Sequence, residues 1–202
     1  MKVTYGASQL IDFETEVANL FNSGKIRAPV HLYDGNEDQM IEIFEDIKED
    51  DWIFCCWRSH YQCLLKGVPQ QRVVDDILDG KSISLCYPDF NIYSSAIVGG
   101  QVPIATGAAL KLKRASASQH VWCFVGDMTS ETGIFYESWK YAVNHDLPIT
   151  FVIENNHKSV CTDTDKAWGH KELFFRNEKR KIKYYEYASK YPHAGAGVRV
   201  NF

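Results

Sequence analysis

The 202-residue chain is 45% hydrophobic and 24% charged, a composition typical of a single globular domain with one sizeable core. Its formal net charge of −4 gives no reason to expect binding to nucleic acid or to a membrane, and no apolar run approaches the roughly 18 residues that cross a bilayer. The N-terminal residues become acidic too early for a signal peptide, and Cys55, Cys56 and Cys123 lie in apolar runs like buried thiols, so we expect a cytoplasmic protein.

The first half of the chain is predicted to contain three helices and a strand. Apolar residues recur at helical spacing over residues 9–21 and 38–50. The β-rich run 51–57 follows, and then a short helix that ends at Gly80. Residues 81–96 show no clear periodicity and are predicted to be a loop.

The second half alternates strands with helices. Helices are predicted over residues 102–114 and 133–145, and strands over 121–125 and 147–154. Because both strands are almost continuously apolar, they are expected to be buried on both faces. The pattern therefore predicts an α/β domain with a parallel sheet covered by helices on both faces.

A basic run lies near the C-terminus. Its positive residues are Lys171, Arg176, Lys179, Arg180, Lys181, Lys183 and Lys190. Such a run is typical of a solvated helix face, and binding of a polyanion is the less favoured alternative. The tail beyond residue 184 is aromatic, then glycine-rich, and its end is compatible with one last strand.

Polar side chains follow the two predicted buried strands. Asp127 comes just after the first strand, and Asn156 just after the second, one crossover later. Because parallel strands end on one rim of their sheet, both should emerge together, where carboxylate and amide oxygens suit Mg²⁺. A helix that starts near residues 129–133 would aim its free N–H groups at an anion there. The spacing alone is equally compatible with ordinary turns at both strand ends.

The sequence resembles the α-subunits of 2-oxoacid dehydrogenase E1 components, which use thiamine diphosphate. Gly126 and Asp127, followed by Asn155 and Asn156, are similar to the Gly-Asp-Gly and Asn-Asn motif of thiamine diphosphate enzymes. The segments "RAPVHLYDGNED", "CWRSHYQCLLKG" and "AIVGGQVPIATGAAL" resemble three more blocks of the family in the same order. The resemblance implies one diphosphate-binding domain over 1–202, with a short C-terminal extension at about 166–202.

The resemblance also implies a metal site and a diphosphate site. The family's Mg²⁺ ligands correspond to Asp127, Asn156 and the backbone carbonyl of Lys158. The aromatic-Arg pair that holds the diphosphate corresponds to Trp57 and Arg58, and arginine suits this role because its planar fork matches phosphate oxygens.

Further cofactor contacts are implied around these residues. The segment that lies along the cofactor's pyrimidine corresponds to Ala96 and Val98. Gly126 precedes the metal ligand, and Met128 and Thr129 would offer backbone contacts after it.

Two histidines are candidates for catalysis. His31 corresponds to a family histidine that faces the substrate, and His60 to the histidine of a Tyr-Arg-x-His block. A histidine there would donate a hydrogen bond or transfer protons near neutral pH.

Three departures from the family pattern concern the reaction. Met128 replaces a motif glycine, Trp57 replaces a tyrosine, and a histidine of the family's Ser-Met-His loop is missing near Ser84. The diphosphate and metal half of the site is therefore expected to be kept, while the substrate half is altered. These changes favour a decarboxylase, a carboligase or a transketolase-like enzyme over a standard dehydrogenase of a multienzyme complex.

The resemblance implies that the chain needs a partner. In the family, the glutamate that activates the aminopyrimidine ring belongs to a separate pyrimidine-binding domain, and no second copy of the fold is evident here. We therefore expect a β-type subunit in an α2β2 assembly that acts on a small 2-oxoacid or ketose. The alternatives are a noncatalytic assembly subunit, an E1 α-subunit of a standard complex, and a plain nucleotide-binding domain, which is disfavoured because no G-x-G-x-x-G or G-x-x-x-x-G-K-[ST] loop is present.

Overall fold

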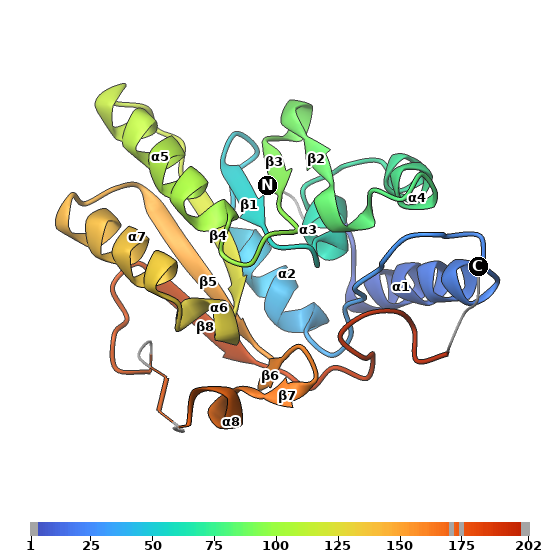
Figure 1. The fold of residues 1–202 in the computed structure, drawn as a ribbon. Coiled ribbons are helices and arrows are strands. Elements are labelled where there is room, and N and C mark those ends of the chain that lie inside the picture. The colour runs from blue at the N-terminus through green and yellow to red at the C-terminus, as the bar shows by residue number, and fades with distance from the viewer. Residues whose placement is uncertain (1–3, 170–171, 174–175, 199–202) are drawn as a thin grey trace.

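The computed structural model describes residues 4–169, 172–173 and 176–198, and one six-stranded sheet organises them (Figure 1). The strands lie in the order β2-β3-β1-β4-β5-β8. They are β1 (Trp52–Cys55), β2 (Cys86–Tyr87), β3 (Ile92–Ser94), β4 (Val121–Gly126), β5 (Ile149–Asn155) and β8 (Ile182–Glu186). All neighbours pair in parallel except β2 and β3, so the predicted α/β fold with a parallel sheet is confirmed.

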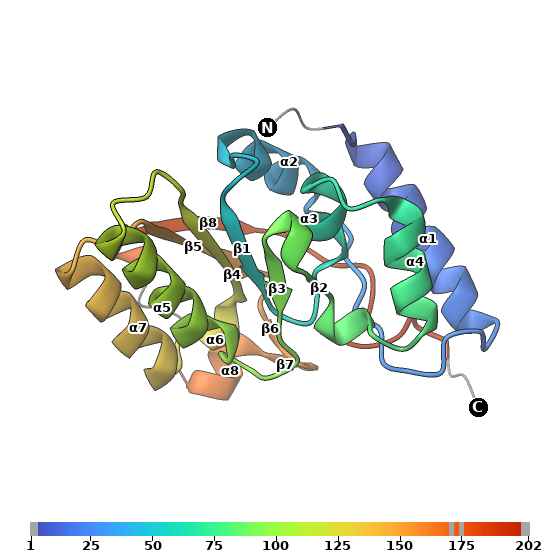
Figure 2. The same cartoon turned by 90° about the horizontal axis from the view of Figure 1, so that it is seen from above.

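Helices cover both faces of this sheet (Figure 2). On one face lie α1 (Ala7–Asn22), α2 (Glu37–Asp46), α3 (His60–Leu65) and α4 (Gln70–Leu78). On the other face lie α5 (Gln101–Arg114) and α7 (Gly133–Asn144). Shorter elements complete the described chain: α6 (Asp127–Ser130), α8 (Thr164–Trp168), the hairpin of β6 (Lys158–Ser159) and β7 (Thr162–Asp163), and the 3-10 turns η1 (Ser82–Ser84) and η2 (Pro88–Phe90).

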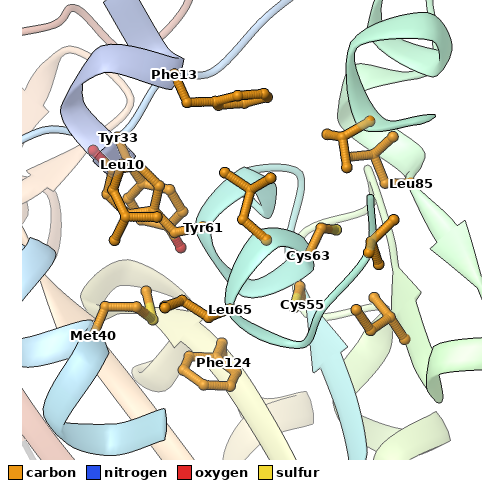
Figure 3. Packing of buried hydrophobic residues seen from close by; sticks show 14 of the residues in the cluster. Leu10, Phe13, Tyr33, Met40, Cys55, Tyr61, Cys63, Leu65, Leu85 and Phe124 are labelled. Atoms are coloured by element: carbon orange, nitrogen blue, oxygen red, sulfur yellow. The ribbon is translucent and has the colours of Figure 1, made fainter. Parts of the chain in front are cut away.

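The sheet separates two apolar cores, and strand β4 contributes side chains to both. Successive side chains of a strand point to opposite faces. Accordingly, Val121, Cys123 and Val125 pack under α5 and α7, whereas Trp122 and Phe124 pack on the other side. Figure 3 shows part of this second core, where Phe124 lies below the side chains of α1 and α3. Full burial of a side chain of this size contributes about 2–3 kcal/mol.

Most of the predicted elements are present within a few residues of their expected bounds. Cys55, Cys56 and Cys123 are buried thiols, as expected. The prediction of a loop over residues 81–96 is wrong, because this segment contains β2 and β3. Strands of two and three residues are too short to show a period, and Pro88 and Asn91 interrupt them.

The basic run is not a helix face where the structure describes it. Residues 182–186 form β8, which pairs in parallel with β5 inside the segment expected as a C-terminal extension. The tertiary pairing with an apolar central strand outweighs the polar sequence of β8. Lys171 and the end of the chain, residues 199–202, lie outside the described residues. None of the helices in the described ranges combines the length and the apolar character that a membrane crossing requires.

Candidate functional site

The site lies beyond the carboxyl ends of four neighbouring strands. The register pairs Gly126 of β4 with Glu154 of β5, which places the residues that follow both strands on one rim. Residues after β1 and β8 join them there, because these two strands flank the β4–β5 pair. The rim holds a cavity of about 170 Å³.

Most of the residues predicted to bind the cofactor line this one cavity. They are Trp57, Arg58, Val98, Gly126, Asp127, Met128, Thr129, Asn156 and Lys158. The structure adds Cys56, Glu154, Ser159, Val160, Tyr187 and His193. Ala96, His31 and His60 are not among the lining residues.

Asp127 is the buried carboxylate of the site, with 1% of its surface exposed. The Thr164 hydroxyl of α8 donates a hydrogen bond to Asp127 Oδ2 at 2.5 Å. Burial raises the pKa of Asp127, while hydrogen bonds from Thr164 and from backbone N–H groups, that of Asn156 included, act in the opposite direction. A buried carboxylate whose pKa is raised in this way gains most from a bound cation, because the cation removes the cost of burying its charge.

Asn156 begins the turn into the β6–β7 hairpin. Its Oδ1 accepts a hydrogen bond from the Lys158 N–H at 3.1 Å, which fixes the side chain beside the rim. His157, in the turn, and Val160, at the hairpin tip, have positive φ angles of 59° and 57°, which are unusual for residues other than glycine. The tight hairpin directs the side chain of Lys158 outward, where it forms an ion pair with Asp163.

Arg58 supplies positive charge to the cavity. Its Nε donates to the Leu32 carbonyl at 3.0 Å, which orients the guanidinium group. It makes no ion pair with any residue in the described ranges. The nearby Glu154 is buried, and burial raises its pKa to about 7 although the hydroxyls of Tyr185 and Tyr33 lie 2.5 and 3.0 Å from it. The cavity is therefore suited to an anionic ligand.

Three aromatic rings are in mutual contact beside the cavity, and two of them, Trp57 and His193, line it. The ring of His31 lies 5.8 Å from that of Trp57 and 4.8 Å from that of His193. Trp57 Nε1 and His31 Nδ1 are buried and have no hydrogen-bond partner in the described part of the chain. Burial and then the charge of Arg58 lower the pKa of His31 to about 3, so its imidazole is neutral near pH 7. His31 is thus next to the cavity and behind Trp57.

His60 lies in a different environment, inside the apolar core. It is 0% exposed, and both of its ring nitrogens have partners: Glu14 Oε2 at 3.0 Å and Ser82 Oγ at 2.9 Å. Acid, histidine and serine in this order are reminiscent of a nucleophilic triad, but all three side chains are buried in the protein core. The structure does not bring His60 to the rim where the sequence placed it.

Val98 reaches the cavity from the loop between β3 and α5, whereas Ala96 is exposed outside it. Gly99, which follows Val98, has a φ of 71°, and a Cβ there would lie 2.8 Å from Ile134 Cγ2 on α7. Glycine therefore lets this loop approach α7 closely. Val98 remains 53% exposed, so one side of the cavity is open to solvent in this chain.

Sequence reasoning missed the residues that follow β8. Tyr187 and His193 both line the cavity, and both belong to the segment that was predicted only as a tail. In the structure Tyr185 and Tyr187 are buried and Tyr184 and Glu186 are exposed, but the residue types of 182–187 do not alternate in polarity, so only a weak signal was available in the sequence. A surrounding run of lysines and arginines masked this signal.

Comparison with known proteins shows similarity over most of the chain. The family described as dehydrogenase E1 component matches residues 5–184. The chain is 31% identical over 166 residues to the pyruvate dehydrogenase E1 component subunit alpha of Porphyra purpurea, an alignment that covers 74% of this chain and 48% of that protein.

Two further relatives are acetoin:2,6-dichlorophenolindophenol oxidoreductase alpha subunits. The protein from Cupriavidus necator is 32% identical over 164 residues, which cover 76% of this chain and 49% of that protein. The protein from Bacillus subtilis is 32% identical over 166 residues, which cover 77% of this chain and 50% of that protein. The chain thus spans about half the length of these curated relatives. Because the family match extends over most of its residues, the chain belongs to the dehydrogenase E1 component family.

Proposed function

We propose that this chain is the diphosphate-binding, α-type subunit of a split enzyme that depends on thiamine diphosphate and Mg²⁺. One observation carries the proposal: Asp127, Asn156 and Arg58 follow three different strands and line one cavity. These are the positions that the family resemblance assigns to the metal and to the diphosphate. The family membership of the chain and the alpha-subunit names of its relatives support the same assignment.

The chemistry of the donors fits these two groups. Asp127, Asn156 and the Lys158 carbonyl would give Mg²⁺ three oxygen ligands, and phosphate oxygens and water would complete its shell. Arg58, which has no ion pair within the described residues, would bind the diphosphate. Met128 and Thr129 line the cavity beside Asp127, where their backbone N–H groups would contact the phosphates.

The bound cofactor would supply the thiazolium carbon that breaks or forms a bond next to a carbonyl group. The role of this chain would be to bind the metal and the diphosphate and to orient the cofactor. His193, which lines the cavity, would face the substrate as a neutral imidazole that donates or accepts a hydrogen bond. The buried His31 in contact with it would be neutral as well, because burial lowers the pKa of each. His60 is a structural residue in this proposal.

The proposal includes a pyrimidine-binding β-type partner, in an α2β2 assembly that closes over the open side of the cavity at Val98. The substrate would be a small 2-oxoacid, an α-hydroxyketone or a ketose. The relatives named for acetoin oxidation favour small hydroxyketone chemistry without excluding 2-oxoacids, since others are named for pyruvate.

Calorimetric titration with thiamine diphosphate and Mg²⁺ tests the proposal, with the chain alone and with its candidate partner. Asp127→Ala should weaken binding at least about 100-fold, because a buried metal ligand is lost. Asp89→Ala, which removes an exposed carboxylate paired with Arg72 away from the cavity, is the matched control and should leave affinity unchanged. Absence of binding by the wild-type chain in both states, or equal affinity of the two variants, would contradict the assignment.

A second measurement addresses the reaction. The assembled protein should oxidise pyruvate or acetoin with 2,6-dichlorophenolindophenol as electron acceptor, and the ratio of the two rates would define the substrate class. Turnover of both substrates by the chain without any partner would refute the split-subunit part of the proposal.

A further inference from the structure

Strand β8 brings a fourth segment to the rim of the site. It pairs in parallel with β5 from Phe151↔Ile182 to Asn155↔Glu186, and Tyr187 follows immediately. The Tyr187 N–H donates to the Asn155 carbonyl at 3.0 Å, which extends this pairing by one residue. Tyr187 therefore occupies the position after β8 that Asp127 occupies after β4. It also lies outside residues 5–184, the range that the family match covers.

The Tyr187 side chain points into the cavity. It is 7% exposed and lines the same space as Arg58 and Asp127. Its N–H is used by the strand pairing, whereas its side chain lines the cavity, and its hydroxyl has no hydrogen bond to another residue of the described ranges. Burial raises its pKa, and although the nearby charge of Arg58 opposes this, the hydroxyl keeps its proton near pH 7. It is therefore available as a donor.

The segment that follows is fastened to the body of the protein. It runs back along the rim toward α1 (Figure 1). The Gly195 N–H donates to the Val30 carbonyl at 2.9 Å, and Gly195 forms a parallel bridge with His31. Lys190 pairs with Asp34 at 3.3 Å. These contacts lie on both sides of His193, so the wall that carries Tyr187 and His193 is positioned before any ligand arrives.

A protonated hydroxyl without a hydrogen-bond partner and a guanidinium group without an ion pair, both within the described residues and lining the same cavity, are suited to an oxyanion. We propose that Tyr187 is a diphosphate-binding residue whose hydroxyl donates a hydrogen bond to the phosphate group that Arg58 pairs with. This inference rests on the proposed function, and it assigns part of the anion site to a segment outside the family match. The ligand class is a diphosphate ester or free pyrophosphate.

Tyr187→Phe tests the inference, because it removes the hydroxyl and keeps the ring. Affinity for thiamine diphosphate with Mg²⁺, measured by calorimetry in whichever state the wild type binds, should fall about tenfold, as expected for a hydrogen bond to a charged group. Tyr191→Phe is the matched control in the same segment. Tyr191 lines the adjoining cavity and is not among the residues that line the cavity of Asp127, so affinity should be unchanged.

Two further readouts separate a phosphate contact from a structural role. Inorganic pyrophosphate with Mg²⁺ has the phosphate groups of the cofactor but not its organic rings. If the hydroxyl contacts a phosphate, Tyr187→Phe should bind pyrophosphate more weakly than the wild type by a similar factor. The ligand-free unfolding midpoint should match that of the wild type, since no protein hydrogen bond is lost.

Unchanged affinity of Tyr187→Phe for both ligands would overturn the inference and leave the cofactor assignment intact. A loss confined to thiamine diphosphate, with pyrophosphate unaffected, would also overturn it, because the hydroxyl would then contact another part of the cofactor. Failure of the wild type to bind either ligand would instead refute the proposed function.

Discussion

Two regions of this molecule contain acidic and histidine side chains, and they differ in how many of their polar atoms have hydrogen-bond partners. Around His60, the carboxylate of Glu14 and the hydroxyl of Ser82 occupy both ring nitrogens, and all three side chains are buried. Around the cavity, Trp57 Nε1 and His31 Nδ1 have no partner among the described residues. The hydroxyl of Tyr187 lacks one as well, within the same ranges.

The comparison distinguishes polar groups that stabilise the fold, such as those around His60, from polar groups at the cavity that would bind a ligand. A buried polar atom without a partner costs about 1–3 kcal/mol, and a ligand in the cavity would offset this cost at Trp57 Nε1. The His60 cluster is complete without a ligand, whereas the cavity is not. The following predictions test this contrast, starting with the largest expected effect.

His60→Ala should destabilise the fold by about 3 kcal/mol, because it opens a void and leaves the buried Glu14 carboxylate without its imidazole partner. Urea unfolding measures the change, and His145→Ala, at an exposed histidine after α7, is the control. Cofactor affinity per folded molecule should stay the same. A large loss of affinity without a loss of stability would place His60 in the functional site and break the contrast.

Arg58→Lys should weaken binding of thiamine diphosphate with Mg²⁺ about tenfold, although the positive charge is retained. The guanidinium fork binds two phosphate oxygens at once, whereas an ammonium group binds as a single point charge. Calorimetry measures the change, with Arg72→Lys, at an exposed ion pair with Asp89, as the control. Equal affinity of the wild type and Arg58→Lys would show that the cavity attracts anions without bidentate contact.

Thr164→Val should reduce Mg²⁺ affinity several-fold, because Asp127 loses the hydrogen bond that fixes one of its carboxylate oxygens. Thr164→Ser keeps the hydroxyl and should restore most of the affinity. The comparison is made by titrating the metal at a constant concentration of thiamine diphosphate. If Thr164→Val binds the metal as tightly as Thr164→Ser and the wild type, the orientation of Asp127 does not depend on α8.

The stability of the fold should depend on pH through His31. Its pKa is about 3 when folded and 6.5 ordinarily, so the unfolded chain takes up a proton first as the pH falls below about 6.5. The resulting stability is present above pH 6.5 and declines below it, by about 0.8 kcal/mol between pH 8 and pH 6. Urea unfolding of the wild type and His31→Asn at both pH values should show this difference. Identical pH dependence would mean that His31 is protonated in the fold as easily as in water.

The sequence was sufficient to predict the central part of the fold and one half of the site. Long apolar strands such as β4 and β5 are evident from their composition, and Asp127 and Asn156 follow them at the spacing of one crossover. Arg58 and Trp57 were found through the resemblance to a family. The same reasoning placed His60 at the rim, because a one-dimensional motif does not show which face of α3 meets the core.

The other half of the site could not be predicted because it depends on contacts distant in sequence. Tyr187 reaches the cavity only because β8 pairs with β5, and the β6–β7 hairpin, α8 and a charged segment separate these two strands in the sequence. His193 is positioned by the pairing of Gly195 with His31, residues at opposite ends of the chain. Neither contact produces a local period, so neither is visible in a short window of sequence.

The place of β8 at the edge of the sheet, within the described residues, has a consequence for how the protein behaves at high concentration. An edge strand offers unpaired backbone groups that can recruit a strand from another molecule, and charged side chains oppose such association. Lys183, which pairs with Asp46 on α2, and the exposed Glu186 supply these charges along β8. Of the basic residues that suggested a helix face, Lys183 lies on this edge strand, and replacing it with valine should favour self-association.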